Sequence, residues 1–178
     1  MSVFTNPATG AEEEAAAYIQ ATLSLLGDQE PLAVLTELAD VMESSVLSHS
    51  TDQLNKPEAP GKWSAKQVVL HMADSELVWG WRLRLILGHD KPEITGYDQD
   101  LWANRLKYSE EDLDLALKRI RVLRESNLRL IQSLTEAERA RTGVHSERGE
   151  ESIEHMIRLY AGHDLVHRQQ LQRILENQ

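Results

Sequence analysis

The chain has 178 residues, of which 41% are hydrophobic and 27% charged, as in one globular domain with a hydrophobic core. Its net charge is −10, from 19 Lys and Arg against 29 Asp and Glu, which disfavours binding to nucleic acids or to anionic membrane surfaces. It contains no Cys, which excludes disulfides, zinc–thiolate sites and a Cys nucleophile.

Two helices are predicted in the first third of the chain. Apolar residues at helical spacing indicate a first helix over residues 11–26, which ends before Gly27. A second helix is expected over residues 30–48, with Pro31 in its first turn, where a missing backbone N–H costs little. The stretch that follows, as far as Gly61, is rich in Pro and is predicted to be a loop.

A third helix is predicted to begin at Ser64 and to end at Gly88. Ser64 and Gln67 have the spacing of a capping box, in which each side chain satisfies the backbone N–H of the other. A long connection with a short helical piece is predicted over 89–108, and a fourth helix over 109–134. A helical turn over 135–141 and a loop over 142–150 then lead to a last helix over 151–176. We expect the 89–108 and 142–150 segments to wall a site, because long ordered loops are frequently functional.

These elements predict an all-α fold. Residues 1–29 are expected to form an N-terminal segment with a short helix, and residues 30–178 a helical-bundle domain. Strand signals are weak, since no long alternating run of β-branched residues occurs. Apolar stripes support the bundle on the fourth helix, at Leu113, Leu117, Ile120, Leu123, Leu130 and Leu134, and on the last, at Met156, Tyr160, Leu171 and Ile174.

Two His lie four residues apart on the last predicted helix. His163 and His167 therefore occupy one helix face, one turn apart, and the stripe through Tyr160 and Leu171 places that face inward. Two imidazoles in this arrangement can bind one metal ion. On the third helix, His71 also lies on the inward stripe, between Val68 and Ser75.

Each of these His has an alternative interpretation, as a core residue that is hydrogen-bonded to a carbonyl or carboxylate. A single inward His favours that interpretation, but three inward imidazoles would be costly to bury together without a metal ion or hydrogen bonds. The sequence therefore predicts a divalent metal at His71, His163 and His167, with a fourth position open for water or substrate. Imidazole ligands favour zinc or nickel, with iron or manganese as further candidates.

Two other metal motifs are disfavoured. The segment from His163 to His167 resembles the HExxH motif of zinc proteases, but Asp164 replaces the Glu and no third ligand follows downstream. A ferritin-like di-iron centre needs two ExxH motifs, and no His in the chain has a Glu three residues before it.

Partners that orient the ligand imidazoles are expected nearby on the same helices. The candidates are Asp74, Tyr160, Gln169 and Gln170. Gly162, in the middle of the last helix, lowers helix stability by about 1 kcal/mol relative to Ala and is expected either to be tolerated or to allow a close approach. His145 is expected at the surface.

The chain is expected to be cytoplasmic. Residues 1–10 lack the basic-then-apolar pattern of a secretory signal. No apolar run approaches the ~20 residues that a membrane-spanning helix needs.

A set of short motifs carries a family resemblance. They are Pro60-Gly-Lys-Trp-Ser64, His71-Met-Ala-Asp-Ser-Glu76, Tyr97-Asp-Gln-Asp-Leu-Trp102, His145-Ser-Glu-Arg-Gly149 and Tyr160-Ala-Gly-His-Asp-Leu-Val-His167. In this order the motifs resemble the DinB/YfiT-like family, over about residues 31–174. The resemblance implies a DinB-like four-helix bundle of up-up-down-down type, here with an extra N-terminal helix and long connections. It also implies a homodimer and a divalent metal held by His71, His163 and His167.

Three functions are compatible with these observations. The first is a metal-dependent enzyme that acts on a small electrophilic substrate, either as a hydrolase or as a transferase of a low-molecular-weight thiol. The resemblance implies thiol transfer for some members of the family. The second is a non-catalytic module that binds a metal or a ligand. The third is a helical dimer in which the His are vestigial. The catalytic residues and the substrate are not predicted.

Overall fold

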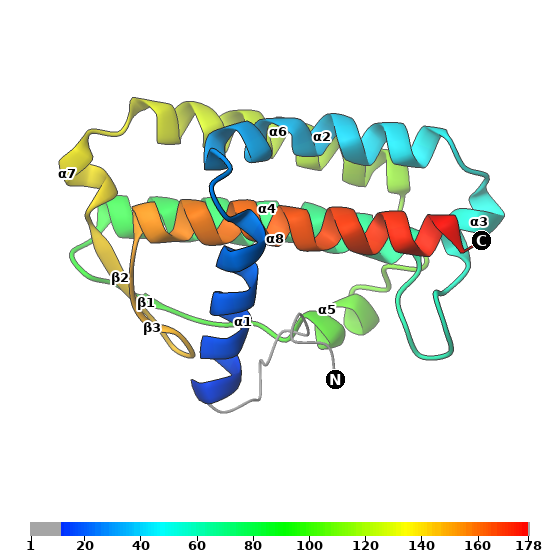
Figure 1. Ribbon diagram of the computed structural model, residues 1–178, viewed down its shortest axis with the longest axis horizontal. Coiled ribbons are helices and arrows are strands. Elements are labelled where there is room, and N and C mark those ends of the chain that lie inside the picture. The colour runs from blue at the N-terminus through cyan, green and yellow to red at the C-terminus, as the bar shows by residue number, and fades with distance from the viewer. Residues whose placement is uncertain (1–11, 178) are drawn as a thin grey trace.

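The computed structural model describes residues 12–177 and shows a helical bundle with a small sheet at one end (Figure 1). The four long helices are α2 (Pro31–Leu47), α4 (Ala65–Gly88), α6 (Leu113–Ser133) and α8 (Ile153–Glu176). The shorter elements are α1 (Glu12–Leu26), α3 (Thr51–Asn55), β1 (Glu93–Ile94), α5 (Gln99–Arg105), α7 (Glu136–Arg139), β2 (Thr142–His145) and β3 (Gly149–Ser152). Within the described residues, no helix has both the length and the apolarity to cross a bilayer. The predicted all-α bundle is confirmed.

The order of the four long helices differs from the expected up-up-down-down type. α2 and α4 each pack against both α6 and α8, so α2 lies diagonally across the bundle from α4. Helices α4 and α6 run in the same direction, as the contacts of Asp74 with Arg119 and of Arg84 with Ser126 show. α2 and α8 run parallel to each other and antiparallel to α4 and α6 (Figure 1). The topology is therefore up-down-down-up, because the long connection after α4 returns the chain to the end of the bundle where α4 began.

The small sheet is a departure from the predicted loops. β1 pairs in parallel with β2, and β2 pairs with β3 in an antiparallel hairpin that closes at Gly149, where φ is +76°. Strands of two and four residues are too short to show the alternation by which strands are recognised in a sequence. Pairing with a segment from a distant part of the chain decides their conformation.

Local capping sets most helix starts. The predicted capping box of Ser64 and Gln67 is present at α4, and Pro31 occupies the first turn of α2. A second capping box, Ser50 with Gln53, begins α3 in a stretch predicted to be loop. The start of α6 was predicted at residue 109 and lies at Leu113, because the Asp112 carboxylate accepts a hydrogen bond from the backbone N–H at the third helical position.

A polar layer divides the hydrophobic core into two parts. One apolar cluster surrounds Met42, Leu70 and Ile120, and the other surrounds Leu35, Leu83 and Ile157. Between them, each of α4, α6 and α8 contributes buried polar residues at the same level of the bundle. These residues are Asp74, Ser75, Glu76, Arg124, Asn127, Asp164 and His167, with His71 at the edge of the layer.

Helix α1 crosses α8 steeply (Figure 1) and packs directly onto its backbone. A Cβ atom added at Gly162 would contact the Thr22 carbonyl oxygen at 2.4 Å, so no larger residue fits there. The close approach that the sequence left as one of two possibilities at Gly162 is therefore confirmed. It explains why a residue that weakens helices stands in the middle of α8.

Candidate metal centre

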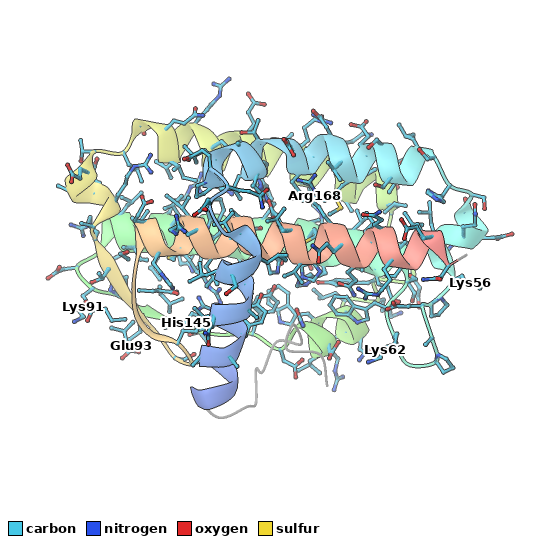
Figure 2. The ribbon with its side chains drawn as sticks, in the orientation of Figure 1. Lys56, Lys62, Lys91, Glu93, His145 and Arg168 are labelled. Carbon is cyan, nitrogen blue, oxygen red and sulfur yellow. The ribbon has the colours of Figure 1, made fainter. Side chains whose placement is uncertain are left out.

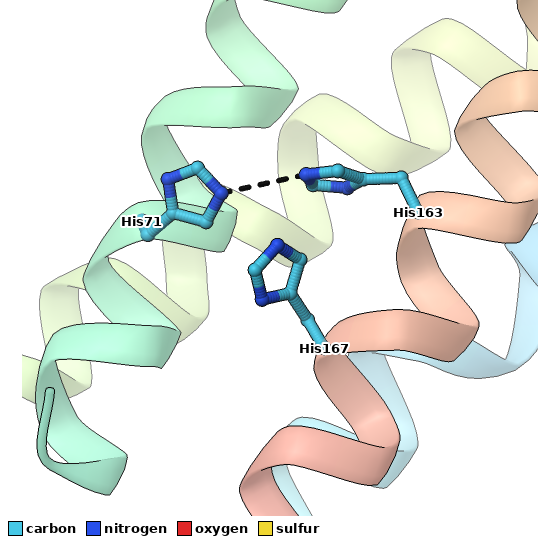
Figure 3. Close-up of side chains that lie close together, drawn as sticks. All are labelled: His71, His163 and His167. Carbon is cyan, nitrogen blue, oxygen red and sulfur yellow. Dashed lines mark hydrogen bonds between the residues drawn. The ribbon is translucent and has the colours of Figure 1, made fainter. Parts of the chain in front are cut away.

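The imidazoles of His71, His163 and His167 project from α4 and α8 toward a common point (Figure 3). One ring nitrogen from each His lies within 4.8 Å of the other two, and the Nε2 atoms of His71 and His163 are 3.4 Å apart. His71 and His167 are buried, and His163 is half-buried. The predicted convergence of the three side chains is thus observed.

The surroundings of the three imidazoles favour their neutral form. Burial is the main cause that lowers the pKa of His167 to about 4. Burial, followed by the charge that His167 would carry, lowers the pKa of His71 and of His163 well below the ordinary value. At neutral pH the site therefore presents uncharged imidazoles, the form in which His binds metals.

Hydrogen bonding orients one of the three rings. The Nδ1–H of His167 donates to the Oε1 atom of Gln170 at 2.8 Å, which leaves Nε2 as the lone-pair nitrogen facing the cluster. Gln170 thus occupies the orienting position that was predicted for it. In the described part of the chain, the Nδ1 atoms of His71 and His163 have no hydrogen-bond partner.

Asp74 is not the partner of His71, contrary to the prediction. Its carboxylate accepts hydrogen bonds from the Tyr108 hydroxyl at 2.7 Å and from Arg119 at 3.2 Å. Tyr160 was another candidate on α8. Its hydroxyl donates to Glu76 at 2.9 Å, and its ring stacks on that of His163, with 5.5 Å between the centroids.

A buried ionic network supports the cluster from behind. Arg124 on α6 donates to Glu76 on α4 at 2.7 Å and to both carboxylate oxygens of Asp164 on α8, at 2.6 and 3.1 Å. All three side chains are at most 2% exposed. Burial opposes the charge of Arg124, but Asp164 and Glu76 outweigh it and raise the pKa of the guanidinium. Asp164 is therefore held by Arg124, which removes the basis for the protease-like alternative.

Two cavities adjoin the cluster. A cavity of about 330 Å³ is lined by His167, Trp63 and Gln170, and a cavity of about 90 Å³ is lined by His71, His163 and Ser75. Gln99, the first residue of α5 within the 89–108 connection, lines both cavities. This position confirms that the long connection after α4 forms part of the wall.

Two hydroxyl groups lie beside the imidazoles in the smaller cavity. Ser75 Oγ is 3.3 Å from His71 Nε2 and 3.2 Å from the Tyr97 hydroxyl. Burial raises the pKa of Tyr97, so its hydroxyl stays protonated and can donate a hydrogen bond at neutral pH. The site thus combines lone-pair nitrogens with hydroxyl donors.

This bundle and its His cluster agree with a known family. The model of the DinB superfamily matches residues 34–171, a range that contains all three His. The chain belongs to the DinB superfamily.

Two curated relatives are similar to most of the chain. A protein from Oceanobacillus iheyensis is 29% identical over 75% of this chain and 77% of its own length. One from Bacillus licheniformis is 30% identical over 75% of this chain and 76% of its own. Their names place both among metal-dependent hydrolases and give no substrate.

A solved structure is also similar. YfiT from Bacillus subtilis superposes with a TM-score of 0.73 at 26% identity, covering 80% of this chain and 84% of YfiT. YfiT is described as a probable metal-dependent hydrolase with an unusual four-helix bundle topology. The chain therefore shares the four-helix-bundle fold of YfiT.

His145 belongs to one of the motifs of the DinB resemblance but lies outside the cluster. It was expected at the surface, whereas it is 2% exposed on β2 of the sheet (Figure 2). Its Nδ1 accepts the backbone N–H of Glu147, and burial, with Arg148 and Arg82 next in order, lowers its pKa to about 3. Burial alternates along β2, with Val144 exposed, so the ring lies on the face of the sheet that is turned away from solvent.

The Arg124 network was not predicted, although the sequence contains a signal for it. The buried face of α6 follows Ala116, Ile120, Arg124, Asn127 and Ile131, at steps of four, four, three and four. The stripe chosen from apolar residues alone is displaced from this face, and most of its members are half-buried. Charged residues at inward helical positions indicate a buried polar layer as clearly as apolar residues indicate a core.

Proposed function

We propose that this protein is a metal-dependent hydrolase in which His71, His163 and His167 hold one divalent cation. The observation that carries the proposal is the convergence of three uncharged imidazoles beside two cavities. The names of the relatives from O. iheyensis and B. licheniformis, and the description of YfiT, support it.

The residues fit a metal ion of this kind. Tetrahedral coordination with Zn–N bonds of about 2.0–2.1 Å separates ligand nitrogens by about 3.3 Å. The Nε2 atoms of His71 and His163 are 3.4 Å apart. The Nδ1 atoms of these two rings lack partners among the described residues, so hydrogen bonding satisfies only the nitrogens that face the cluster. An all-imidazole set favours zinc or nickel, and iron is a further candidate.

A bound cation would act as a Lewis acid and would lower the pKa of a coordinated water to about 7. The hydroxyls of Ser75 and Tyr97 are placed to donate to a substrate oxygen in the smaller cavity. Trp63, whose ring centroid lies 5.1 Å from that of His71, walls the larger cavity with an apolar surface. The carboxylates of Glu76 and Asp164 are held by Arg124, so their role is to position α4 and α8.

Elemental analysis of protein purified without a His-tag, combined with an ester-hydrolysis assay, tests the proposal. We expect about one equivalent of zinc or nickel per chain. Hydrolysis should disappear with a chelator and return when the metal is restored. Metal-loaded protein that hydrolyses no ester or amide would leave the non-catalytic binding module as the better description. Protein without retained metal would contradict the metal-dependent hydrolase.

Transfer of a low-molecular-weight thiol is a second candidate. The two cavities on different sides of the cluster favour it, because two reactants could approach the same centre. The chain has no Cys, so the thiol would come from solution. Loss of free thiol in the presence of an electrophile, compared between the native protein and a His71→Ala variant, separates this reaction from hydrolysis.

The predicted homodimer and cytoplasmic location stay predictions. Light scattering coupled to size-exclusion chromatography measures the first. Fractionation of the source cells measures the second.

Replacement of Gln170 by Leu is expected to weaken metal binding by about 10–100-fold, the usual loss when the group that orients a ligand imidazole is removed. The leucine cannot accept the Nδ1–H of His167, so the ring loses its fixed orientation. A competition titration with a coloured chelator measures the change. Gln170→Glu keeps an acceptor at the same place and should retain most of the affinity. Equal affinity in all three proteins would show that Gln170 does not orient the ligand.

Metal affinity is expected to persist to lower pH than the ordinary imidazole pKa of about 6.5 would allow. Protons compete with the metal only as pH falls toward the lowered pKa values, about 4 for His167. Affinity should therefore stay nearly constant from pH 7 to about pH 5 and fall steeply below it. Metal titrations across this range measure the midpoint. A midpoint near pH 6.5 would contradict the buried, uncharged state of the three rings.

A further inference from the structure

Two arginines share the smaller cavity with the His cluster. Arg82 on α4 and Arg148 in the β2–β3 turn line it together with His71, His163 and Ser75. Imidazoles that hold a metal need no cations nearby, yet both guanidiniums are close enough to His145 to lower its pKa, after the larger effect of burial. The positive charge in this wall therefore calls for an explanation of its own.

Arg82 has no carboxylate partner within the described residues. Its guanidinium donates one hydrogen bond, to the Thr95 carbonyl oxygen at 2.9 Å, and lies over the Tyr97 ring at 6.0 Å from the centroid. Burial and then the neighbouring Arg148 lower the pKa of Arg82. A guanidinium carries five N–H donors and stays charged at neutral pH, so Arg82 keeps donors for a ligand.

Arg148, by contrast, is paired. Its Nε and one terminal nitrogen donate to the Glu151 carboxylate at 3.1 and 2.7 Å, and Glu151 is 4% exposed. The pair fixes the direction of Arg148 and balances its charge. Arg82 is therefore the cation of this wall that has no ion pair among the described residues, although the charges of Glu151 and Glu147 also act on it.

We propose that this cavity binds the carboxylate of a short-chain substrate through Arg82, with Arg148 beside it. The planar guanidinium matches a carboxylate in shape and charge. The volume of about 90 Å³ admits only a short acyl group, which places a reacting carbonyl next to Ser75 and the cluster. A chain with a net charge of −10 repels anions elsewhere, so a local cation is needed to bind one. This inference rests on the proposed function and specifies its substrate class.

Binding of a matched pair of probes to the full chain tests the inference. The probes are 4-oxopentanoate, which carries a carboxylate and a carbonyl but no hydrolysable bond, and its neutral amide 4-oxopentanamide. Calorimetry with and without zinc should show binding of the acid at least about tenfold tighter than that of the amide. Arg82→Gln should remove this difference. Arg82→Lys, which keeps the charge, should restore part of it.

Arg129→Gln is the matched control, because it removes the same charge from an exposed residue on α6 whose side chain is 77% exposed. It should leave the preference for the acid unchanged. Circular dichroism establishes that each variant is folded. A preference for the acid that survives in folded Arg82→Gln would overturn the proposal, and would assign Arg82 to holding the Thr95 segment only.

A kinetic comparison separates this proposal from the proposed function. Zinc-loaded protein should hydrolyse monomethyl succinate with a higher kcat/KM than dimethyl succinate, and Arg82→Gln should remove the difference. Equal hydrolysis of both esters, unchanged in the variant, would support the hydrolase and overturn the carboxylate site. No hydrolysis of either ester, with binding of 4-oxopentanoate that depends on Arg82, would support the site and count against the hydrolase.

Discussion

Replacement of His163 by Ala is expected to abolish stable metal binding. The metal affinity should fall by more than about 100-fold, which exceeds the loss expected when a residue that only orients a ligand is replaced. The Nε2 atom of His163 lies 3.4 Å from that of His71, and its ring centroid lies 4.4 Å from that of His167. Two imidazoles from different helices would remain, which is one fewer than the usual protein ligand set of a catalytic zinc site. Metal content after dialysis and hydrolysis rate should fall together.

His155→Ala is the control for this experiment. His155 lies two turns earlier on α8, is half-buried and is not part of the cluster. Its removal should leave the metal content unchanged. If dialysed His163→Ala retained as much metal as the native protein, the cluster would not be the metal site.

Replacement of Arg124 by Met is expected to lower the free energy of unfolding by about 3–5 kcal/mol. The variant leaves the carboxylates of Glu76 and Asp164 buried at the same level of the bundle without their common cation. In a domain of this size each kcal/mol lowers Tm by about 2–4 °C, so we expect a fall of roughly 6–20 °C. Thermal and denaturant unfolding followed by circular dichroism measure the loss.

Two comparisons separate the effect of unpaired buried charges on stability from the effect of replacing an arginine or of altered packing. Arg129→Met removes an exposed arginine of the same helix and should change stability by less than about 0.5 kcal/mol. A triple variant with Leu at positions 76, 124 and 164 removes the whole network and should regain much of the lost stability, because no unpaired charge remains. A triple variant less stable than Arg124→Met would show that packing, not charge pairing, dominates at this layer.

The position of the network also links stability to the candidate site. Asp164 follows His163 in the chain, and Tyr160 joins Glu76 by a hydrogen bond while stacking on the His163 ring. The network therefore fixes the rotation of α8 that directs His163 toward His71. We accordingly expect Arg124→Met to weaken metal binding even below its unfolding temperature.

Local features of the sequence determined much of this molecule. The 3.6-residue period placed His163 and His167 on one face, and the capping box of Ser64 and Gln67 began α4 where expected. These predictions depend on residues within one or two turns of each other, whose relative positions the helix itself sets. For the same reason the orienting role of Gln170, three residues after His167, was predictable.

Distant pairings were not predictable in the same way. Asp74 was assigned to His71 because both lie on α4, but its carboxylate instead accepts hydrogen bonds from Tyr108 and Arg119. His145 was assigned to the surface, but β2 joins β1 and β3 in a sheet whose buried face carries the ring. In both cases a partner far away in the chain overrode the local expectation, because a buried polar group takes whichever partner packing brings to it.

The sequence by itself determined which residues can bind a metal and which helix face carries them, because helical geometry is a property of neighbouring residues. Only the tertiary structure decided that the α4 imidazole meets the pair on α8, that Arg124 supports them, and that Arg82 faces the same cavity. The reason is physical: the direction and order of the four long helices are set by the burial of their apolar faces and by the long connection after α4. Those long-range contacts determine which side chains lie together in the polar layer.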